Sequence, residues 1–265
     1  MISARRSEPV MRFFDVYVRR YLGRHFDRVR LWGAPQALDI PPGMPLLCVM
    51  SHAAWWDVLI GYYLARRIVR RESYAPMDEP QLRRYRILSR LGVYSVDRSS
   101  VAGLRAFLRY TAGLLSEERA IWITPQGEII SNWKRPVRFQ MGVGHLVRLR
   151  PEVAVVPVAV HYEFMDEARP DIFIRFGPAR RFQAARESAA EIVRLLEADL
   201  QETLDHVLKD VTERSLDGYT VLLEGATSTS LVYDTVRSVR AWLTGRPDPA
   251  RHGDVVSDPR KGRMK

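Results

Sequence analysis

Residues 46–67 read LLCVMSHAAWWDVLIGYYLARR, a short apolar run followed almost at once by a helical pattern. The run Leu46–Met50 is typical of a buried strand, and the pattern at residues 58–69 is typical of a helix. His52 lies between the two, and Asp57 follows it by five residues. This stretch therefore predicts a strand that leads into a helix, with a histidine at the turn.

The chain beyond this stretch keeps alternating short apolar runs with helical patterns. Further strands are expected at residues 93–96, 120–124, 153–160 and 172–176, and further helices at residues 79–91, 101–115, 139–149 and 187–211. Strands separated by helices of this length predict an α/β fold, with a mostly parallel sheet flanked by helices.

The composition is that of a folded globular protein. The chain has 265 residues, of which 46% are hydrophobic and 27% are charged. This length fits one large domain or two tightly fused small ones, and the composition excludes a disordered or fibrous chain. Cys48 is the single cysteine, which excludes an internal disulfide and a cysteine-built zinc site and is compatible with a reducing cytosol.

The charge of the chain is strongly basic. Lys and Arg number 41 against 31 Asp and Glu, for a net charge of +10, and only four of the basic residues are Lys. Guanidinium groups suit partners that carry phosphate, such as a membrane surface or a nucleic acid. A genome-wide preference for Arg would explain the Arg/Lys ratio equally well. No nucleic-acid-binding motif accompanies the charge, so we expect no nucleic acid partner.

Residues 10–29 have the apolar spacing of one face of a helix, and the opposite face carries five arginines and two aspartates. Aromatic side chains opposite a basic face are typical of a helix that lies in the lipid headgroup layer. A helix that packs on the core and exposes its arginines has the same pattern. The sequence leaves both interpretations open.

Three parts are expected along the chain: an amphipathic, basic membrane-surface helix at residues 1–32, a main α/β domain at residues 33–245 and a disordered basic tail at residues 246–265. The N-terminus lacks the apolar core of a signal peptide. The longest charge-free run, residues 40–56, is too short and too rich in proline for a bilayer, which takes about 20 apolar residues. We expect a cytoplasmic protein with no transmembrane helix.

His52 and Asp57 have the spacing of a general base and its partner. On a regular helix, side chains five residues apart point about 140° away from each other, so the two meet only if His52 precedes the helix or lies in its irregular start. A carboxylate bonded to one ring nitrogen leaves the other to accept a proton, and this arrangement activates a hydroxyl nucleophile. His161 and Asp166 share the spacing. No amphipathic helix follows them, so we expect His161 to be structural.

Three further segments follow the His-x4-Asp pair in order. A Gly-strand-Arg block reads LGVYSVDR and ends at Arg98, a turn reads PQGE at residues 125–128, and the strand VAVVPVAV has a central proline. In this order the chain resembles the lysophospholipid (glycerolipid) acyltransferase superfamily over residues 46–160. The resemblance implies that His52 is the catalytic base and that Asp57 orients it. It also implies a substrate-binding site made of Arg98, which would bind the acceptor's phosphate, and of Pro125, Gln126, Gly127 and Glu128.

The same resemblance implies a reaction and its partners. A fatty acyl group would move from an acyl-CoA or acyl carrier protein thioester, as co-substrate, to a hydroxyl of a lipid acceptor such as 1-acylglycerol-3-phosphate. No metal and no resident cofactor are expected. Both substrates are amphiphiles, so the protein is expected to bind peripherally to a membrane surface with anionic lipids.

One block departs from the family pattern. The family usually has Glu between Pro and Gly and then Thr-Arg-Ser, whereas this chain has Gln126, and Ile129 and Ile130 follow Glu128. Bidentate Arg contacts are strong, so the loss of an arginine weakens the case for a clamped phosphomonoester. A glycolipid, another lysolipid or a hydroxylated isoprenoid is then an alternative acceptor. A lipid-binding protein without catalysis and a basic nucleic-acid-binding protein are the alternative functions.

Overall fold

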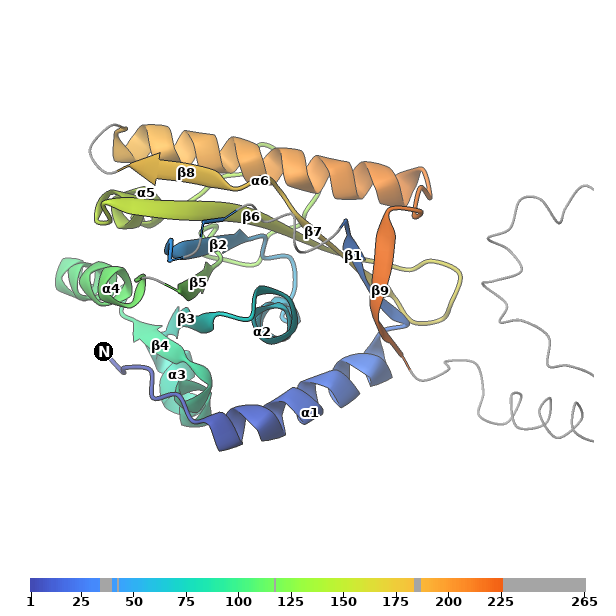
Figure 1. Ribbon diagram of the computed structural model, residues 1–265, viewed down its shortest axis with the longest axis horizontal. Helices are drawn as coiled ribbons and strands as arrows, with labels where there is room; N and C mark the ends of the chain where they lie inside the picture. The colour runs from blue at the N-terminus through green and yellow to red at the C-terminus, as the bar shows by residue number, and fades with distance from the viewer. Residues whose placement is uncertain (34–39, 42, 117, 184–186, 226–265) are drawn as a thin grey trace, which may run out of the picture.

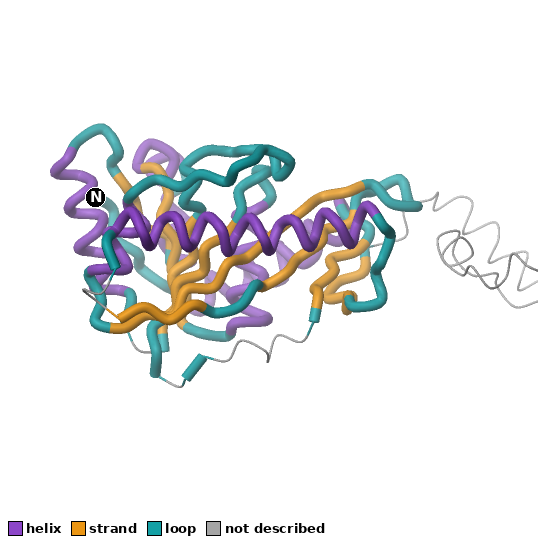
Figure 2. Tube along the Cα trace, turned by 90° about the horizontal axis from the view of Figure 1, so that it is seen from above, coloured by secondary structure: helices purple, strands orange, loops and turns teal. Residues whose placement is uncertain are grey.

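The computed structural model describes residues 1–33, 40–41, 43–116, 118–183 and 187–225. Its helices are α1 (Glu8–His25), α2 (Asp57–Leu64), the π-helix η2 (Ala65–Val69), α3 (Glu79–Arg84), the 3-10 helix η3 (Arg86–Leu91), α4 (Val101–Leu114), α5 (Gly142–Arg148) and α6 (Ala189–Thr212). Its strands are β1 (Arg28–Trp32), β2 (Leu46–Met50), β3 (Glu72–Asp78), β4 (Val93–Val96), β5 (Arg119–Ile123), β6 (Glu152–Glu163), β7 (Asp171–Phe176), β8 (Arg180–Gln183) and β9 (Tyr219–Glu224). Figures 1 and 2 show a layer of strands with helices on both sides.

The strands form one mixed sheet in the order β4-β3-β5-β2-β6-β7-β1-β9, and β8 pairs with β6. The neighbours from β4 to β6 are parallel to one another, and β1 is parallel to β7. The pairs β6–β7, β6–β8 and β1–β9 are antiparallel. The α/β fold with a mostly parallel sheet, expected from the sequence, is confirmed.

Helices cover the two faces of this sheet, with α5 and α6 on one face and α1 and α2 on the other (Figure 1). A hydrophobic core lies between the sheet and the helices on each face. Strand β2 contributes side chains to both of these cores, because alternate side chains of a strand point to opposite faces. Cys48 packs in the cluster that contains Leu22 of α1 and Ile60 of α2. Val49 packs in the cluster that contains Ile192 of α6. All five residues of β2 are buried, which explains why its sequence is apolar without alternation.

The five strands expected from the sequence occur as β2, β4, β5, β6 and β7. The helical stretch at residues 79–91 is divided into α3 and η3, because the backbone of Tyr85 leaves the helical region at φ −116° and ψ 56°. The sequence pattern does not predict the other four strands, β1, β3, β8 and β9. They contain charged residues or proline, as in RVRLW of β1 and ESYAPMD of β3, and so lack a long apolar run.

The helical pattern at residues 10–29 extends beyond the helix that forms. Helix α1 ends at His25, Phe26 is extended at φ −121° and ψ 149°, and the chain continues into β1. Strand β1 is hydrogen-bonded between β7 and β9. The side chain of Arg30 also binds Asp171 of β7 at 2.7 Å. Residues 28–32, expected within the N-terminal helix, therefore lie inside the main sheet.

The apolar side chains of α1 are divided between two stripes. Met11, Val18 and Leu22 are buried against the body of the protein. Another stripe is exposed and contains Phe13, Val16 and Tyr17, next to Arg12, Arg19, Arg20 and Arg24. Helix α1 thus packs on the core, as expected for a core-packing helix. It also presents the aromatic and basic outer face that is expected for a helix in the lipid headgroup layer.

Some expectations fall outside the described residues, namely the tail at residues 246–265 and the end of the main domain. They stay predictions. Among the residues that the structure does describe, no helix is both long and apolar enough to cross a membrane.

Candidate active site

The carboxyl ends of β2, β4, β5 and β6 meet at one edge of the sheet, since these strands run parallel. The segments that leave this edge carry His52 after β2, Arg98 after β4 and Gln126 after β5. Tyr162 lies near the end of β6. The sheet therefore gathers polar groups that are far apart in the sequence.

His52 and Asp57 form a hydrogen-bonded pair at this edge. The Nδ1 atom of His52 lies 2.9 Å from Oδ2 of Asp57. Helix α2 begins at Asp57, so His52 precedes the helix, as the spacing requires for the two side chains to meet. The His52 side chain is 19% exposed, and among the described residues no group binds its Nε2 atom. The pair thus has the geometry of a base oriented by an acid, with the second ring nitrogen open to a substrate.

The carboxylate of Asp57 is buried, and both of its oxygens accept hydrogen bonds. Oδ2 also accepts the backbone N–H groups of Ala53 at 2.7 Å and Ala54 at 2.8 Å. Oδ1 accepts the hydroxyl of Tyr162 at 2.5 Å. The first turn of a helix also favours a negative charge. These contacts fix the carboxylate and compensate for its burial.

Two contacts hold the backbone of His52. Its N–H donates to Oε1 of Gln126 at 2.9 Å, and its carbonyl oxygen accepts the N–H of Ile130 at 2.7 Å. Gln126 is buried, so its amide oxygen serves the backbone of His52 rather than solvent. The turn after β5 thereby fixes the backbone of His52 at the point where the chain leaves β2.

Arg98 connects three segments of this edge. It donates to the carbonyl oxygen of Gly127 at 2.7 Å, and its Nε lies 2.7 Å from Asp78 at the end of β3. Gly127 has φ +81°, a conformation that a residue with a Cβ adopts at a cost. Arg98 keeps about half of its side chain exposed, at 52%. It is thus both a support of the Gln126 turn and a cation at the surface.

The residues expected at the substrate site differ in exposure. Pro125 and Gln126 are buried, Gly127 is half-buried and Glu128 is exposed. Gln126 and Glu128 line a cavity of about 160 Å³, together with Lys134 and Arg138. Substrate binding by these residues stays a prediction.

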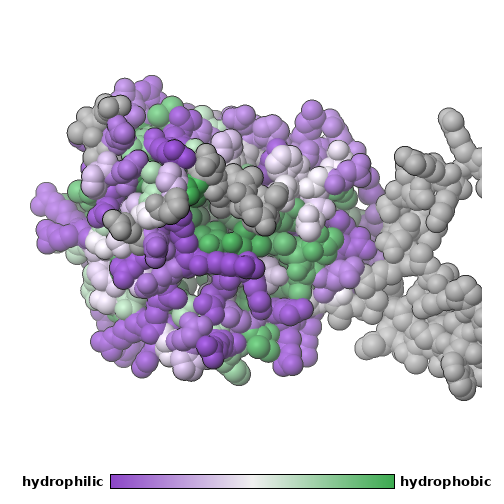
Figure 3. All heavy atoms as spheres, in the orientation of Figure 1, coloured by the Kyte–Doolittle hydropathy of each residue, from purple (hydrophilic) through white to green (hydrophobic). Residues whose placement is uncertain are grey.

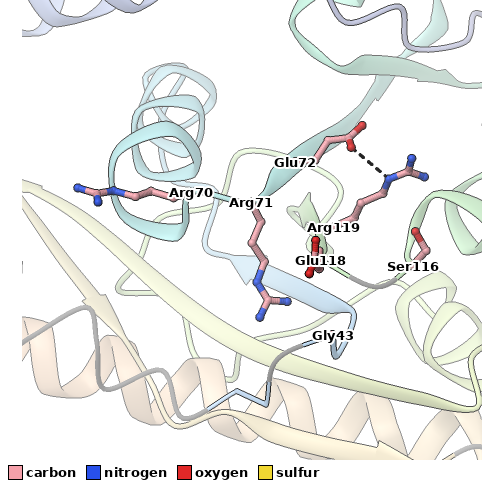
Figure 4. Close-up of a pocket in the computed structure, with 7 residues that line it drawn as sticks. All are labelled: Gly43, Arg70, Arg71, Glu72, Ser116, Glu118 and Arg119. Atoms are coloured by element: carbon pink, nitrogen blue, oxygen red, sulfur yellow. Dashed lines mark ion pairs between the residues drawn. The ribbon is translucent and has the colours of Figure 1, made fainter.

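A larger cavity, of about 610 Å³, lies at the opposite edge of the sheet. It is lined by residues at the amino ends of β2, β3 and β5, among them Arg71, Glu72 and Arg119 (Figure 4). Glu72 and Arg119 form an ion pair there at 3.4 Å, and Arg71 donates to the carbonyl oxygen of Met44. This cavity is therefore separated from His52 by the length of the strands.

His161 does not join the His52 site. It is buried beside Asn132 and within 3.3 Å of Glu163, and burial lowers the pKa of its ring. Asp166 binds Arg214 at 2.6 Å, so His161 and Asp166, which have the second His-x4-Asp spacing, do not form a pair. Adjacent residues of β6 point to opposite faces of the sheet, which places His161 away from Tyr162 and Asp57.

Three other residues of the stretch 46–67 are packed or exposed as follows. The ring of Trp56 packs edge-on against Phe26 with centroids 4.8 Å apart, whereas Trp55 is 62% exposed. Cys48 is fully buried, and burial raises the pKa of its thiol well above the ordinary value. A thiol of this kind is inert toward acyl transfer.

Tyr162 and Ile130 are site residues that the sequence motifs do not reveal. A signal for Tyr162 exists in hindsight: the polar stretch HYE directly follows the apolar residues of β6. The carboxyl end of a parallel strand is a common place for functional side chains. Nothing in the local sequence of Ile130 indicates its contact with His52.

Residues 36–161 match the model of the protein family described as Acyltransferase. This segment is an acyltransferase domain. The match contains the His52–Asp57 pair, Arg98 and the Gln126 turn, and it confirms the family that the four sequence blocks indicate. The chain thus contains an acyltransferase domain, and acyl transfer is the chemistry to which its site residues are compared.

One solved structure similar to this acyltransferase is the 1-acyl-sn-glycerophosphate (LPA) acyltransferase PlsC from Thermotoga maritima. The two are 16% identical, the alignment covers 78% of this chain and 80% of that chain, and the TM-score is 0.48. No curated protein matches the chain.

Proposed function

We propose that this acyltransferase moves a fatty acyl group from a thioester to a hydroxyl of a lipid acceptor, with His52 as the catalytic base. The observation that carries the proposal is the pair of His52 and Asp57, joined at 2.9 Å and situated at the edge of the acyltransferase domain where four strands end. The donor is acyl-coenzyme A or acyl carrier protein, both of which present the same thioester.

In the proposed mechanism the acceptor hydroxyl attacks the thioester carbonyl carbon, and Nε2 of His52 takes the hydroxyl proton as the new C–O bond forms. Asp57 holds the Nδ1–H of the ring and stabilises the imidazolium. The tetrahedral intermediate then expels the thiolate, which receives the proton from His52. Proton transfer of this kind accelerates a reaction about 10²- to 10⁴-fold, so positioning of the two substrates supplies much of the remaining rate.

The surroundings of Arg98 bear on the acceptor. Its guanidinium lies against the carboxylate of Asp78 and the carbonyl oxygen of Gly127, both at 2.7 Å. An arginine that is already paired offers less charge to a phosphomonoester than an unpaired one. Together with the loss of the arginine that the family has after its Pro-Glu-Gly block, where this chain has Ile129 and Ile130, this favours acceptors other than 1-acylglycerol-3-phosphate, such as a glycolipid, another lysolipid or a hydroxylated isoprenoid.

Exposed apolar residues support a lipid substrate and peripheral binding to a membrane, for which we propose the cytoplasmic surface. The segments that follow β2, β5 and β6 expose Trp55, Ile129, Trp133 and Phe164, each by more than half. Figure 3 shows an apolar band across one face of the molecule, bordered by hydrophilic residues. The outer face of α1 adds aromatic side chains and arginines, and basic residues attract anionic lipid by about 1 kcal/mol each near a bilayer.

The test is thiol release from acyl-coenzyme A and acyl carrier protein donors, with and without a panel of lipid acceptors. We expect acceptor-dependent release by the wild-type protein and at least about a 10³-fold loss in His52→Ala. His145→Ala is the matched control, because His145 is exposed on α5, away from the pair. Retention of activity by His52→Ala would refute the proposed base. Release with 1-acylglycerol-3-phosphate alone would refute the wider choice of acceptor. No release with any donor would favour the lipid-binding alternative.

A further inference from the structure

Asp57 has two carboxylate oxygens with different partners. Oδ2 faces His52 and also accepts the N–H groups of Ala53 and Ala54. Oδ1 has the hydroxyl of Tyr162 at 2.5 Å, and among the described residues no other group donates to it. The orientation of the Asp57 carboxylate therefore depends on a residue 105 positions away in the sequence.

The ring of Tyr162 is held by its own surroundings. Val160 and Tyr162 point to the same face of β6, and both pack in the core cluster that α1 and α2 cover. The ring of Phe26 packs against Tyr162 with centroids 5.8 Å apart and also against Trp56 at 4.8 Å. The hydroxyl of Tyr162 is thereby aimed at Asp57 by packing, not only by the hydrogen bond.

The hydroxyl also keeps its proton. Burial and the nearby negative charge of Asp57 raise the pKa of Tyr162 well above 10. A protonated phenol is a donor to a carboxylate, and hydrogen bonds to charged groups are the stronger ones. A carboxylate fixed by donors on both oxygens cannot rotate away from the Nδ1–H that it must hold.

We propose that Tyr162 is a positioning residue that acts through Asp57 to keep His52 oriented for proton transfer. The inference depends on the proposed function, since it assumes that His52 is the base. Tyr162 does not contact the reacting atoms in this arrangement. Its loss is therefore expected to change the chemical step and not the binding of either substrate.

The first experiment compares Tyr162→Phe with the wild-type protein. We expect kcat to fall about 10- to 100-fold, with the KM values for donor and acceptor changed by less than about twofold. The matched control is Tyr94→Phe, because Tyr94 is a buried tyrosine away from the pair, and among the described residues its hydroxyl has one hydrogen-bond partner, Thr111, at 2.9 Å. The control should keep wild-type kcat. A wild-type kcat in Tyr162→Phe, or an equal loss in Tyr94→Phe, would overturn the proposal.

A double-mutant cycle separates positioning from a general structural effect. If Tyr162 acts through Asp57, adding Tyr162→Phe to Asp57→Asn should lower kcat by less than about twofold further. A full 10- to 100-fold further loss would show an independent role and overturn the proposal. His52→Ala reports on the proposed function separately: activity in that variant refutes the base itself, whereas an inactive His52→Ala with a fully active Tyr162→Phe refutes only the positioning role.

A second variant covers the case in which Tyr162→Phe does not fold. Replacement of Tyr162 by 4-aminophenylalanine keeps the ring and a weaker N–H donor to Asp57. We expect this variant to have a kcat several-fold below wild type, and above that of Tyr162→Phe where both fold. A wild-type kcat in the amino variant would contradict the proposal, because donor strength would then not matter.

Discussion

At the scale of single residues, the site depends on the hydrogen bonds that hold the backbone of His52. Gln126 stands where the family usually has Glu, and it accepts the N–H of His52 at 2.9 Å while it is buried. An amide oxygen and a carboxylate oxygen can both accept this bond. The Gln found here therefore preserves the support of His52 while it removes a charge from the site.

We predict that Gln126→Ala lowers kcat about 10- to 100-fold, because the N–H of His52 loses its buried acceptor and the ring can shift. Gln126→Glu should retain most of the wild-type kcat, since a carboxylate can accept the same bond. Steady-state kinetics with varied acceptor concentration measure both values. A rise in the acceptor KM alone, with kcat unchanged, would instead assign Gln126 to direct substrate binding, the role implied by the sequence motif.

At the scale of elements, α1 buries one part of its apolar residues against the body of the protein and exposes another part. The periodicity of its sequence marks all its apolar residues alike, and only packing decides which of them are covered. Leu22 is fully buried, whereas Phe13 is 76% exposed. The exposed stripe with its arginines is the part of α1 that remains available to a bilayer.

We predict that replacing Phe13, Val16 and Tyr17 together by Ser weakens binding to anionic phospholipid vesicles by at least about tenfold, because the apolar area that enters the headgroup layer is lost. Sedimentation with vesicles at low salt measures the binding. Val101→Ser on α4 is the control, as Val101 is 66% exposed but lies on another element. Unchanged binding of the triple variant would place the membrane contact elsewhere. Circular dichroism should show both variants folded.

At the scale of the whole molecule, the N-terminal segment is part of the main fold. Strand β1 fills the place between β7 and β9, and α1 covers the face of the sheet on which Cys48 and Ile60 pack. The order of the sheet therefore joins the beginning of the described chain to its last strand. An N-terminal unit that ends at residue 32 would be separable only if these contacts contributed little.

We predict that a chain starting at Gly33 does not unfold cooperatively. It loses Val18, Leu22, Val29 and Leu31, all buried, and each contributes about 1.5–3 kcal/mol on burial, which together is comparable to the usual total stability of about 5–15 kcal/mol. Thermal unfolding followed by circular dichroism tests this, with the triple α1 variant as the cooperative control. A sharp transition near the wild-type Tm would show that residues 1–32 form a separable part.

Local patterns in the sequence predict some strands of the sheet and miss others, and burial rather than position in the sheet separates the two sets. β2, β4, β5, β6 and β7 are recognisable because their side chains are mostly buried and therefore apolar. The strands β1, β3, β8 and β9 are not recognisable, since charged and half-buried residues weaken the periodicity on which such a prediction depends. The break at Tyr85 within residues 79–91 likewise leaves no clear signal in the pattern.

By itself the sequence determined the class of fold and the pair of His52 and Asp57 in the candidate site. His52 and Asp57 are five residues apart, so the strand-to-helix turn that brings them together is a local property of the chain. Gln126 and Tyr162 reach the same pair from 74 and 105 residues away. Only the tertiary structure decided these contacts, because they depend on which strands lie side by side, and side-chain periodicity within a strand does not specify the neighbours of that strand.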